Sequence, residues 1–496
     1  MLGLDGVEKL LRSAESSNVP LPDIAKRQLR VVISSVRNDI SLLDSTALHS
    51  SRFVSLHHEK SALLMRLNAA ISPIKDLPQE IIAEIISSCV SSTVHLAALG
   101  PNESPWNLTQ ICSVWRHIAL TTPSLWNDIT VQFPCHQECE SAHLRGMLEI
   151  FLSRAGNLPI SLDISAAMFY DYNPFCSPFI DSIIDIVRPH VGRLQSLELQ
   201  PPWVFMPLLE LPGGVVRALE SVTLVFAKED GDSPPFFGHG DGLTSNITAF
   251  EAAPDLRSVY LISQYADMHL NAFRLPWAQL THLTILETYV DFADGHEVLR
   301  QCTSLISCSI GVATDDFCVP TISPTILRNL ESLTVHAYDE EGTHGRFLEP
   351  FILPCLRHLE LTSENNAPWS EMNVAPLIRR SSPAKLESFH STAMTPRDVS
   401  AVLAEVPLLK ELSICFLGRE PDRSLDALVT AIARGDLVPN VQKLDLDLQD
   451  TYTWGRQPPK PCITIQCHPG EMRQGIWDSC SKLRTQGIEI IFHTNG

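Results

Sequence analysis

LESLTV at residues 330–335 and LRHLEL at residues 356–361 share the spacing L-x-x-L-x-L. Further segments keep this spacing, some of them with other residues at the aliphatic positions. The ten segments begin at Leu194, Leu219, Leu256, Leu280, Leu305, Leu330, Leu356, Leu386, Leu409 and Val441. Most successive starts lie 23 to 26 residues apart, and the longer steps indicate insertions. Self-similarity at such a period predicts a stacked repeat architecture.

Stretches with helical periodicity lie between many of these segments. Examples are FIDSIIDIVRPHV at residues 179–191 and LDALVTAIARG at residues 425–435. Strands joined through helices pair in parallel, and each unit can bury its leucines only against its neighbours. The sequence therefore predicts an α/β fold in which residues 158–496 form an irregular leucine-rich-repeat solenoid with a parallel sheet.

The predicted strands have an inward and an outward face, because side chains alternate along a strand. In the first segment, Leu197 and Leu199 are expected to face the core and Glu198 to face outward. The same register predicts an outward row of Glu198, Thr223, Tyr260, Thr284, Ser309, Thr334, Glu360, His390, Ser413 and Asp445. This row lacks the Lys/Arg track that phosphate binding needs. It is either a solvated surface or a face that binds a protein target.

Candidate target-binding residues come from this row and from one insertion. Those in the row are Glu198, Tyr260, Glu360, His390 and Asp445. The insertion KEDGDSPPFFGHGDGLTSN at residues 228–246 contributes Phe236 and Phe237. It is interpreted as either a contact loop or a disordered segment.

Residues 1–72 are predicted to be helical. Two apolar stripes at steps of three and four support this, and they comprise Leu29, Val32, Val36, Ile40, Leu43 and Ala47, then Leu56, Leu63, Leu67 and Ala70. The polar step at Ser50 and Ser51 leaves one long helix and a hairpin of two helices as alternatives. The stripes either form a coiled-coil homodimer or pack on the next domain, and packing is the favoured interpretation.

Residues 73–130 are predicted to form three short helices, followed by a connecting helix within residues 131–157. In DLPQEIIAEIIS, Asp76 is expected to cap a helix and Pro78 to lie in its first turn. Apolar residues from Leu108 to Ala119 predict one further helix, and Thr122 with Pro123 starts a final turn. So small a bundle has more apolar surface than it can bury within itself. The surplus indicates a protein partner.

This region resembles an F-box, the helical module by which substrate receptors dock on the Skp-type adaptor of SCF ubiquitin ligases. The resemblance is carried by LPQEIIAEII, ICSVWRHIA and PSLW, which occur in the family's order. It implies that the adaptor-facing surface is formed or supported by Leu77, Pro78, Ile81, Ile85, Ile111, Cys112, Trp115, Leu125 and Trp126.

Nearly the whole chain is similar to the expanded F-box-like receptors of mushroom-forming fungi, strongly over residues 73–130 and loosely over the rest. Nearly twenty residues separate the first two predicted helices of residues 73–130, where an F-box usually has a short link. The resemblance implies a substrate receptor that joins the cullin and RING subunits through the adaptor and binds an unknown protein target with its repeats. A leucine-rich scaffold without a ligase role remains an alternative.

Composition argues against several classes of function. Acidic residues outnumber basic ones 57 to 37, a formal net charge of −20, which disfavours nucleic acid and anionic membrane as ligands. No apolar run approaches the roughly 18 residues that a membrane span needs. Thirteen irregularly spaced cysteines and a start without signal-peptide features predict reduced thiols and a cytoplasmic or nuclear location.

No sequence motif predicts catalysis. Phosphate-binding, nucleophile-elbow and zinc-protease patterns are missing, so we expect no enzyme and no cofactor, with an unrecognised active site as the alternative. Cys135, His136, Cys139 and His143 form the nearest metal-like cluster, and Cys462, Cys467 and His468 another. A zinc site gathers four ligands from two paired elements. Both clusters are therefore interpreted as structural, with no metal.

Overall fold

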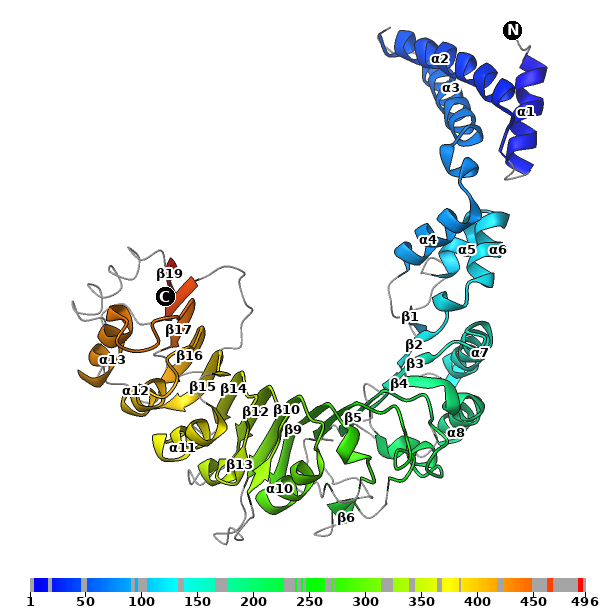
Figure 1. The fold of residues 1–496 in the computed structure, drawn as a ribbon. Helices are drawn as coiled ribbons and strands as arrows, with labels where there is room; N and C mark the ends of the chain where they lie inside the picture. Colours follow the sequence, from blue (N-terminus) through cyan, green and yellow to red (C-terminus); the bar gives the residue numbers. More distant parts are fainter. Residues whose placement is uncertain are drawn as a thin grey trace. The chain divides into compact units, whose positions relative to one another are not determined.

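A computed structural model of the chain describes residues 4–16, 20–45, 51–90, 94–96, 105–132, 138–165, 177–200, 202–226, 237–238, 242–243, 247–263, 270, 273–313, 324–338, 344–363, 368–382, 385–416, 423–447, 462–466 and 489–493. The chain divides into two compact units (Figure 1). We call Met1–Thr130 with Met147–Leu158 the helical unit, and Val131–Gly146 with Pro159–Gly496 the sheet unit.

The helical unit is built mainly from short helices. Its elements are α1 (Leu4–Ser16), α2 (Asp23–Ser45), α3 (Ser51–Ala70), η1 (Pro73–Asp76), α4 (Gln79–Cys89), β1 (Val94–His95), α5 (Trp106–Ile111), α6 (Ser113–Thr121), η3 (Pro123–Leu125), the start of β2 (Asp128–Gln132) and the end of α7 (Glu138–Arg154). Strands β1 and β2 pair in parallel, with Val94 opposite Ile129.

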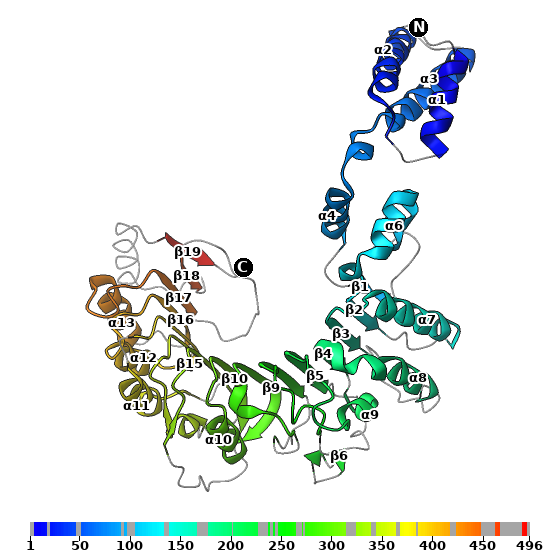
Figure 2. The same cartoon turned by 45° about the vertical axis from the view of Figure 1, so that its right-hand side comes forward.

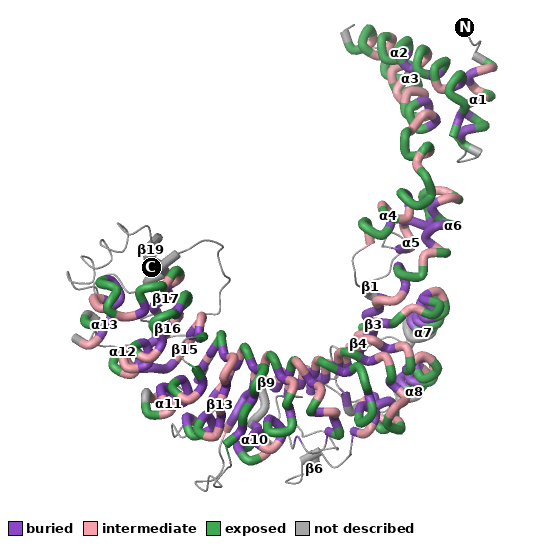
Figure 3. The backbone as a smooth tube through the Cα atoms, viewed as in Figure 1, coloured by how far each residue is buried: buried purple, intermediate pink, exposed green. Residues whose placement is uncertain are grey.

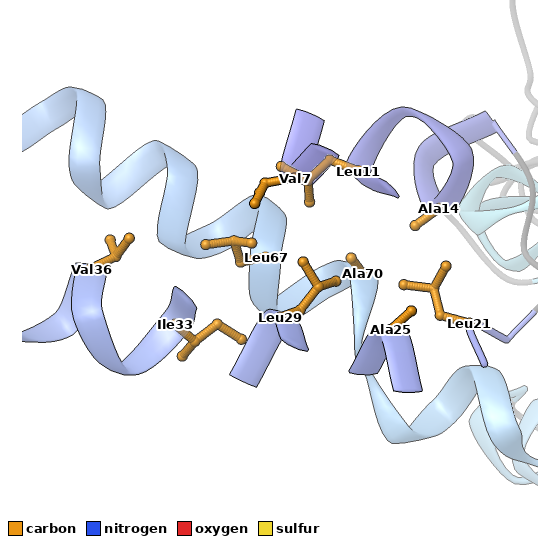
Figure 4. Close-up of a cluster of buried hydrophobic side chains, with 10 residues drawn as sticks. All are labelled: Val7, Leu11, Ala14, Leu21, Ala25, Leu29, Ile33, Val36, Leu67 and Ala70. Atoms are coloured by element: carbon orange, nitrogen blue, oxygen red, sulfur yellow. The ribbon is translucent and has the colours of Figure 1, made fainter. Parts of the chain in front are cut away.

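Helices α1, α2 and α3 pack around a core of their own (Figure 4). Its buried side chains are Val7, Leu11, Ala14, Leu21, Ala25, Leu29, Ile33, Val36, Leu67 and Ala70. Because α2 ends at Ser45 and α3 begins at Ser51, the two stripes belong to two helices. Most residues of the two stripes pack within this bundle and not on the next domain, which contradicts the favoured interpretation for them.

Helix α1 lies within the residues predicted to be helical, but its apolar stripe was not identified: Val7, Leu11 and Ala14 repeat at helical steps and are buried. Arg66 of α3 joins α1 through Glu15, with Nε 2.7 Å from Oε1, and through Glu8. Leu56 is an exception within the second stripe, because it is exposed. Ala47 lies outside the described residues.

A large parallel sheet forms the sheet unit, as predicted. Its strands are β3 (Ile160–Ser165), β4 (Leu194–Gln200), β5 (Ser221–Phe226), β8 (Ser258–Ser263), β9 (His282–Asp291), β10 (Ser307–Ala313), β12 (Ser332–Ala337), β14 (His358–Ser363), β15 (Ser388–Met394), β16 (Glu411–Phe416), β17 (Lys443–Asp447), β18 (Cys462–Gln466) and β19 (Glu489–His493). They neighbour one another in this order. Each of the ten leucine segments supplies one strand.

Shorter elements complete the unit. The helices are α8 (Ser177–Val187), η5 (Arg188–Arg193), η6 (Pro202–Phe205), α9 (Met206–Leu209), η8 (Trp277–Gln279), α10 (Phe292–Gln301), η9 (His344–Leu348), α11 (Glu371–Ser381), α12 (Pro396–Leu403) and α13 (Arg423–Arg434). Two small pairs are β6 (Phe237–Gly238) with β7 (Gly242–Leu243), and β11 (Thr325–Ile326) with β13 (Phe351–Ile352).

Burial alternates along most of the strands for which it is described, which places the core on one side of the sheet (Figure 3). In β12, Leu333 and Val335 are buried while Thr334 between them is only half-buried. Helices α10 to α13 lie along one side of the sheet (Figures 1 and 2). Buried residues of these helices, such as Val298 and Val402, complete the core between helices and strands. The other side carries the predicted outward row.

Buried His296 makes this core sensitive to pH. Its Nε2 donates to the Phe347 carbonyl oxygen at 2.9 Å, and its ring stacks on the Phe347 ring at 4.7 Å between centroids. Burial lowers the pKa of His296, although the Phe347 carbonyl and the charge of Asp291 act to raise it. The folded state therefore holds a neutral imidazole.

We expect the sheet unit to lose stability as the pH falls below about 6.5, the ordinary pKa of histidine. In this range the unfolded chain binds more protons than the folded one, so the free energy of unfolding decreases with pH. Denaturant titrations at several pH values measure the slope of the free energy of unfolding against pH. His296→Gln, which keeps a hydrogen-bond donor but cannot titrate, should flatten it. An unchanged slope would contradict the assignment.

Candidate functional site

Helix α4 begins at Gln79, two residues later than a cap at Asp76 predicts. Pro78 occupies the position before the helix, with extended backbone, and no side chain caps the end. Asp76 was expected to be the cap, which is wrong. Its carboxylate instead lies 2.5 Å from Nζ of Lys26 on α2. This ion pair ties the segment before α4 to the α1–α3 bundle.

The four isoleucines of α4 divide between two faces. Ile82 and Ile86 are buried, whereas Ile81 is 46% exposed and Ile85 is half-buried. Residues four apart share one helix face, so Ile81 and Ile85 form an outward pair. Immediately before the helix, Leu77 is half-buried and Pro78 is exposed. The outward side of α4 therefore carries a pair of apolar side chains in contact with water, beside the exposed Glu80 and Glu84.

The segment after α4 contains two helices where one was predicted. Cys112 has an extended backbone with φ −163°, which ends α5 and begins α6. The backbone N–H of Trp115 donates to its Sγ at 3.5 Å, so the thiol caps α6. Ile111, the last residue of α5, is 57% exposed. The break leaves this isoleucine outside the core.

Three of the residues assigned to form or support the adaptor-facing surface lie in the interior. Trp115, Leu125 and Trp126 are buried, so of these two roles only support is open to them. The indole N–H of Trp126 donates to the Ala119 carbonyl oxygen at 2.9 Å. This bond fixes the final turn against α6.

Helix α7 packs on the same tryptophan. The Phe151 ring lies 4.8 Å from that of Trp126 between centroids, and the Trp106 ring 5.2 Å from it. The Arg154 guanidinium lies 4.4 Å from the Trp126 ring centroid and 4.8 Å from that of Trp106, a cation–π arrangement. Burial lowers the pKa of Arg154. Sequence reasoning missed Trp106, Phe151 and Arg154, because nothing local links α7 to residues 106–126.

We call the candidate adaptor-contact residues that remain accessible the docking patch. It comprises Leu77, Pro78, Ile81, Ile85, Ile111 and Cys112, all of them half-buried or exposed. The patch belongs to α4, the turn before it and the α5–α6 junction. Accessible apolar side chains of this kind are candidates for contact with a protein partner.

The outward row of the sheet follows the predicted register. Successive partners across neighbouring strands are Asp163, Glu198, Thr223, Tyr260, Thr284, Ser309, Thr334, Glu360, His390, Ser413 and Asp445. All of them are half-buried, as expected for an outward face. Phe236 lies outside the described residues, and for Phe237 only its place in β6 is described.

Polar contacts connect the row near β14. The Thr334 hydroxyl donates to Oε2 of Glu360 at 3.3 Å, and Nε2 of His390 lies 3.9 Å from Oε1 of the same carboxylate. Burial lowers the pKa of His390, opposed by the charges of Glu360 and Asp445. A neutral His390 therefore leaves the carboxylates to set the charge of this region at neutral pH.

At the other end of the row, Asp163 lies directly opposite Glu198 on the neighbouring strand. Burial raises the pKa of Glu198, and the charge of Asp163 raises it further. Like charges opposite each other destabilise a sheet.

We expect Glu198→Gln to raise the melting temperature at pH 7, because it removes this repulsion and keeps the side-chain shape. The gain should shrink as the pH falls towards about 4, the ordinary pKa range of a carboxyl, since the wild-type Glu198 then becomes neutral. Thermal unfolding of the variant and the unchanged chain at both pH values measures this gain in melting temperature. A lower melting temperature at pH 7 would show that the carboxylate stabilises the fold.

Comparisons with known proteins do not assign the chain to a family: no family model matches it, and no curated protein matches it significantly. Within the described parts of the chain, no three His, Cys, Asp or Glu side chains are grouped to hold a metal ion. Cys135, His136, Cys467 and His468 lie outside those parts. No described helix combines the length and apolarity needed to cross a bilayer.

Proposed function

We propose that the chain is the non-catalytic substrate-recognition subunit of an SCF-type cullin-RING ubiquitin ligase. In this proposal, residues 73–130 are an F-box-like module that binds a Skp-type adaptor, and through it the cullin and RING subunits. The sheet unit is an irregular leucine-rich-repeat domain that binds the target protein. Such a receptor needs no cofactor, nucleic acid or membrane, and it acts in the cytoplasm or nucleus.

The observation that supports this most is the position of the isoleucines. Ile82 and Ile86 complete the interior, while Ile81 and Ile111 stay in water at the positions that the F-box resemblance assigns to adaptor contact. Full burial of one such side chain is worth about 2 kcal/mol. A complex in which a partner covers the docking patch is stabilised by this burial, whereas the chain without a partner is not.

Such a receptor accelerates ubiquitin transfer by proximity alone. Adaptor and cullin hold the charged ubiquitin-conjugating enzyme, and the receptor holds the target beside it. The transfer then proceeds at the high effective concentration of a tethered pair, without a bond-making group from this chain.

Co-expression with a Skp-type adaptor tests the proposal. The full chain should elute with the adaptor as one complex in size-exclusion chromatography, and addition of the cullin and RING subunits should enlarge it. A known F-box receptor serves as the positive control. If that receptor binds the adaptor and the full chain stays free, the ligase proposal is wrong and a leucine-rich scaffold becomes the better hypothesis.

A further inference from the structure

The outward face of the sheet has two acidic regions. One is the facing pair Asp163 and Glu198 on β3 and β4. A positive charge placed between two like charges relieves their repulsion as well as attracting each of them. A cation placed at this pair of carboxylates would be attracted by both of them.

The second acidic region lies on β14 to β17. Glu360 and Asp445 belong to the outward row, and Glu411 is exposed at the start of β16. Lys443 lies opposite Glu411 on β17 and offsets one of these three carboxylates. Among these four side chains, carboxylates therefore outnumber the ammonium group three to one.

An apolar patch lies between the two acidic regions. Val225, Ile262 and Leu286 are partners across β5, β8 and β9, and Tyr260 lies two residues before Ile262 on the same face. All four are half-buried on the outward side. Farther along the sheet, the positions in line with them are His336 and Thr362, which are polar. The apolar character is thus confined to the part of the face between the acids.

We propose that this face binds an extended basic segment of the target protein. One Lys or Arg of the segment lies at Asp163 and Glu198, an apolar side chain lies against Tyr260 and Ile262, and a second Lys or Arg lies near Glu360. The inference rests on the proposed function, in which the sheet unit binds the target. An acidic or phosphorylated segment would instead be repelled at both ends.

The strand order sets the spacing of the segment. Neighbouring strands lie about 4.8 Å apart, and an extended chain advances about 3.3 Å per residue. Two strand steps separate β4 from β8, and four separate β8 from β14. An extended segment lying across the strands therefore places its apolar residue about three positions from one of its basic residues and about six positions from the other. Either chain direction satisfies this spacing.

Selection from a random library of displayed twelve-residue peptides, with the full chain as bait, tests the inference. The selected peptides should carry two basic residues about nine positions apart with an apolar residue between them. Their binding should weaken as salt is added, because the contacts are between charges near the surface. Selected peptides that are neutral or acidic, or a selection without enrichment, would overturn the inference.

Paired variants locate the binding face. Glu198→Gln with Glu360→Gln should weaken the selected peptides at least tenfold in fluorescence anisotropy. Glu251→Gln with Glu297→Gln removes the same charge from exposed positions outside the strands and should leave binding unchanged. Because Glu198→Gln is expected to stabilise the fold, weaker binding would not reflect unfolding. Equal binding by both double variants would contradict the assigned face.

The peptide-binding experiment and the adaptor-binding experiment can fail independently of each other. The Glu198 and Glu360 variants should bind the adaptor like the unchanged chain, because both residues lie in the sheet unit and the docking patch lies in the helical unit. If the adaptor binds and the library gives no basic peptides, only the target-class inference fails. If basic peptides are selected and the adaptor does not bind, only the ligase role fails.

Discussion

Replacing Trp126 by alanine is expected to unfold the helical unit. The indole is fully buried, packs against Phe151 and Trp106, and holds the final turn to α6 through the Ala119 carbonyl. Removal of a core aromatic costs about 3–5 kcal/mol, a large part of the stability of a domain. Denaturant unfolding followed by tryptophan fluorescence and circular dichroism measures the loss.

Ile81→Ala is the matched control for this experiment. It also shortens an apolar side chain of the helical unit, but Ile81 is 46% exposed. Surface substitutions usually change stability by less than about 0.5 kcal/mol. A cost for Ile81→Ala as large as that for Trp126→Ala would contradict the division of this unit into core and docking patch.

The second large effect is expected on adaptor affinity. Ile81→Asp with Ile111→Asp should weaken adaptor binding by about a thousandfold, because each anchor contributes about 2 kcal/mol and each carboxylate would be buried without a partner. Isothermal titration or surface plasmon resonance on the full chain measures the affinity. Both positions are exposed in the free chain, so its melting temperature should hardly change.

Ile24→Asp supplies the comparison for this variant. Ile24 is an exposed isoleucine of the same unit, on α2, and does not belong to the docking patch. Its replacement should leave adaptor affinity within about twofold, a change below 0.5 kcal/mol. Equal weakening by Ile24→Asp and the patch variant would place the adaptor elsewhere or indicate a nonspecific effect of added charge.

The sheet could be predicted because its pattern is local and repeated. In L-x-x-L-x-L the last two leucines are two residues apart, which fixes both the strand and the inward face. The same spacing placed Glu198, Tyr260 and Glu360 in one outward row, and the observed pairing confirms that row. A one-residue shift in register would have reversed every one of these faces.

The helical unit was predicted less well, because its details depend on distant contacts. Periodicity showed that α4 is amphipathic and that apolar residues recur around Trp115. It could not show that Asp76 pairs with Lys26 fifty residues away. Neither could it show that Trp126 is covered by Phe151 and Arg154 of α7.

The break at Cys112 illustrates a different limit. Apolar spacing continues through Ile111, Cys112 and Trp115 as it would in one helix. The structure inserts a single extended residue there, and the thiol caps the second helix. Cysteine is not among the preferred capping residues, so the sequence contained no strong signal for this boundary.

Hydrogen–deuterium exchange of the full chain, with and without the adaptor, tests the central claim most directly. Adaptor binding should slow exchange in residues 77–89 and 111–121, which carry the docking patch, and leave exchange unchanged in the strands of the sheet unit. Slower exchange confined to the strands, or none in residues 77–89, would contradict the claim that the exposed isoleucines of the helical unit are covered by an adaptor.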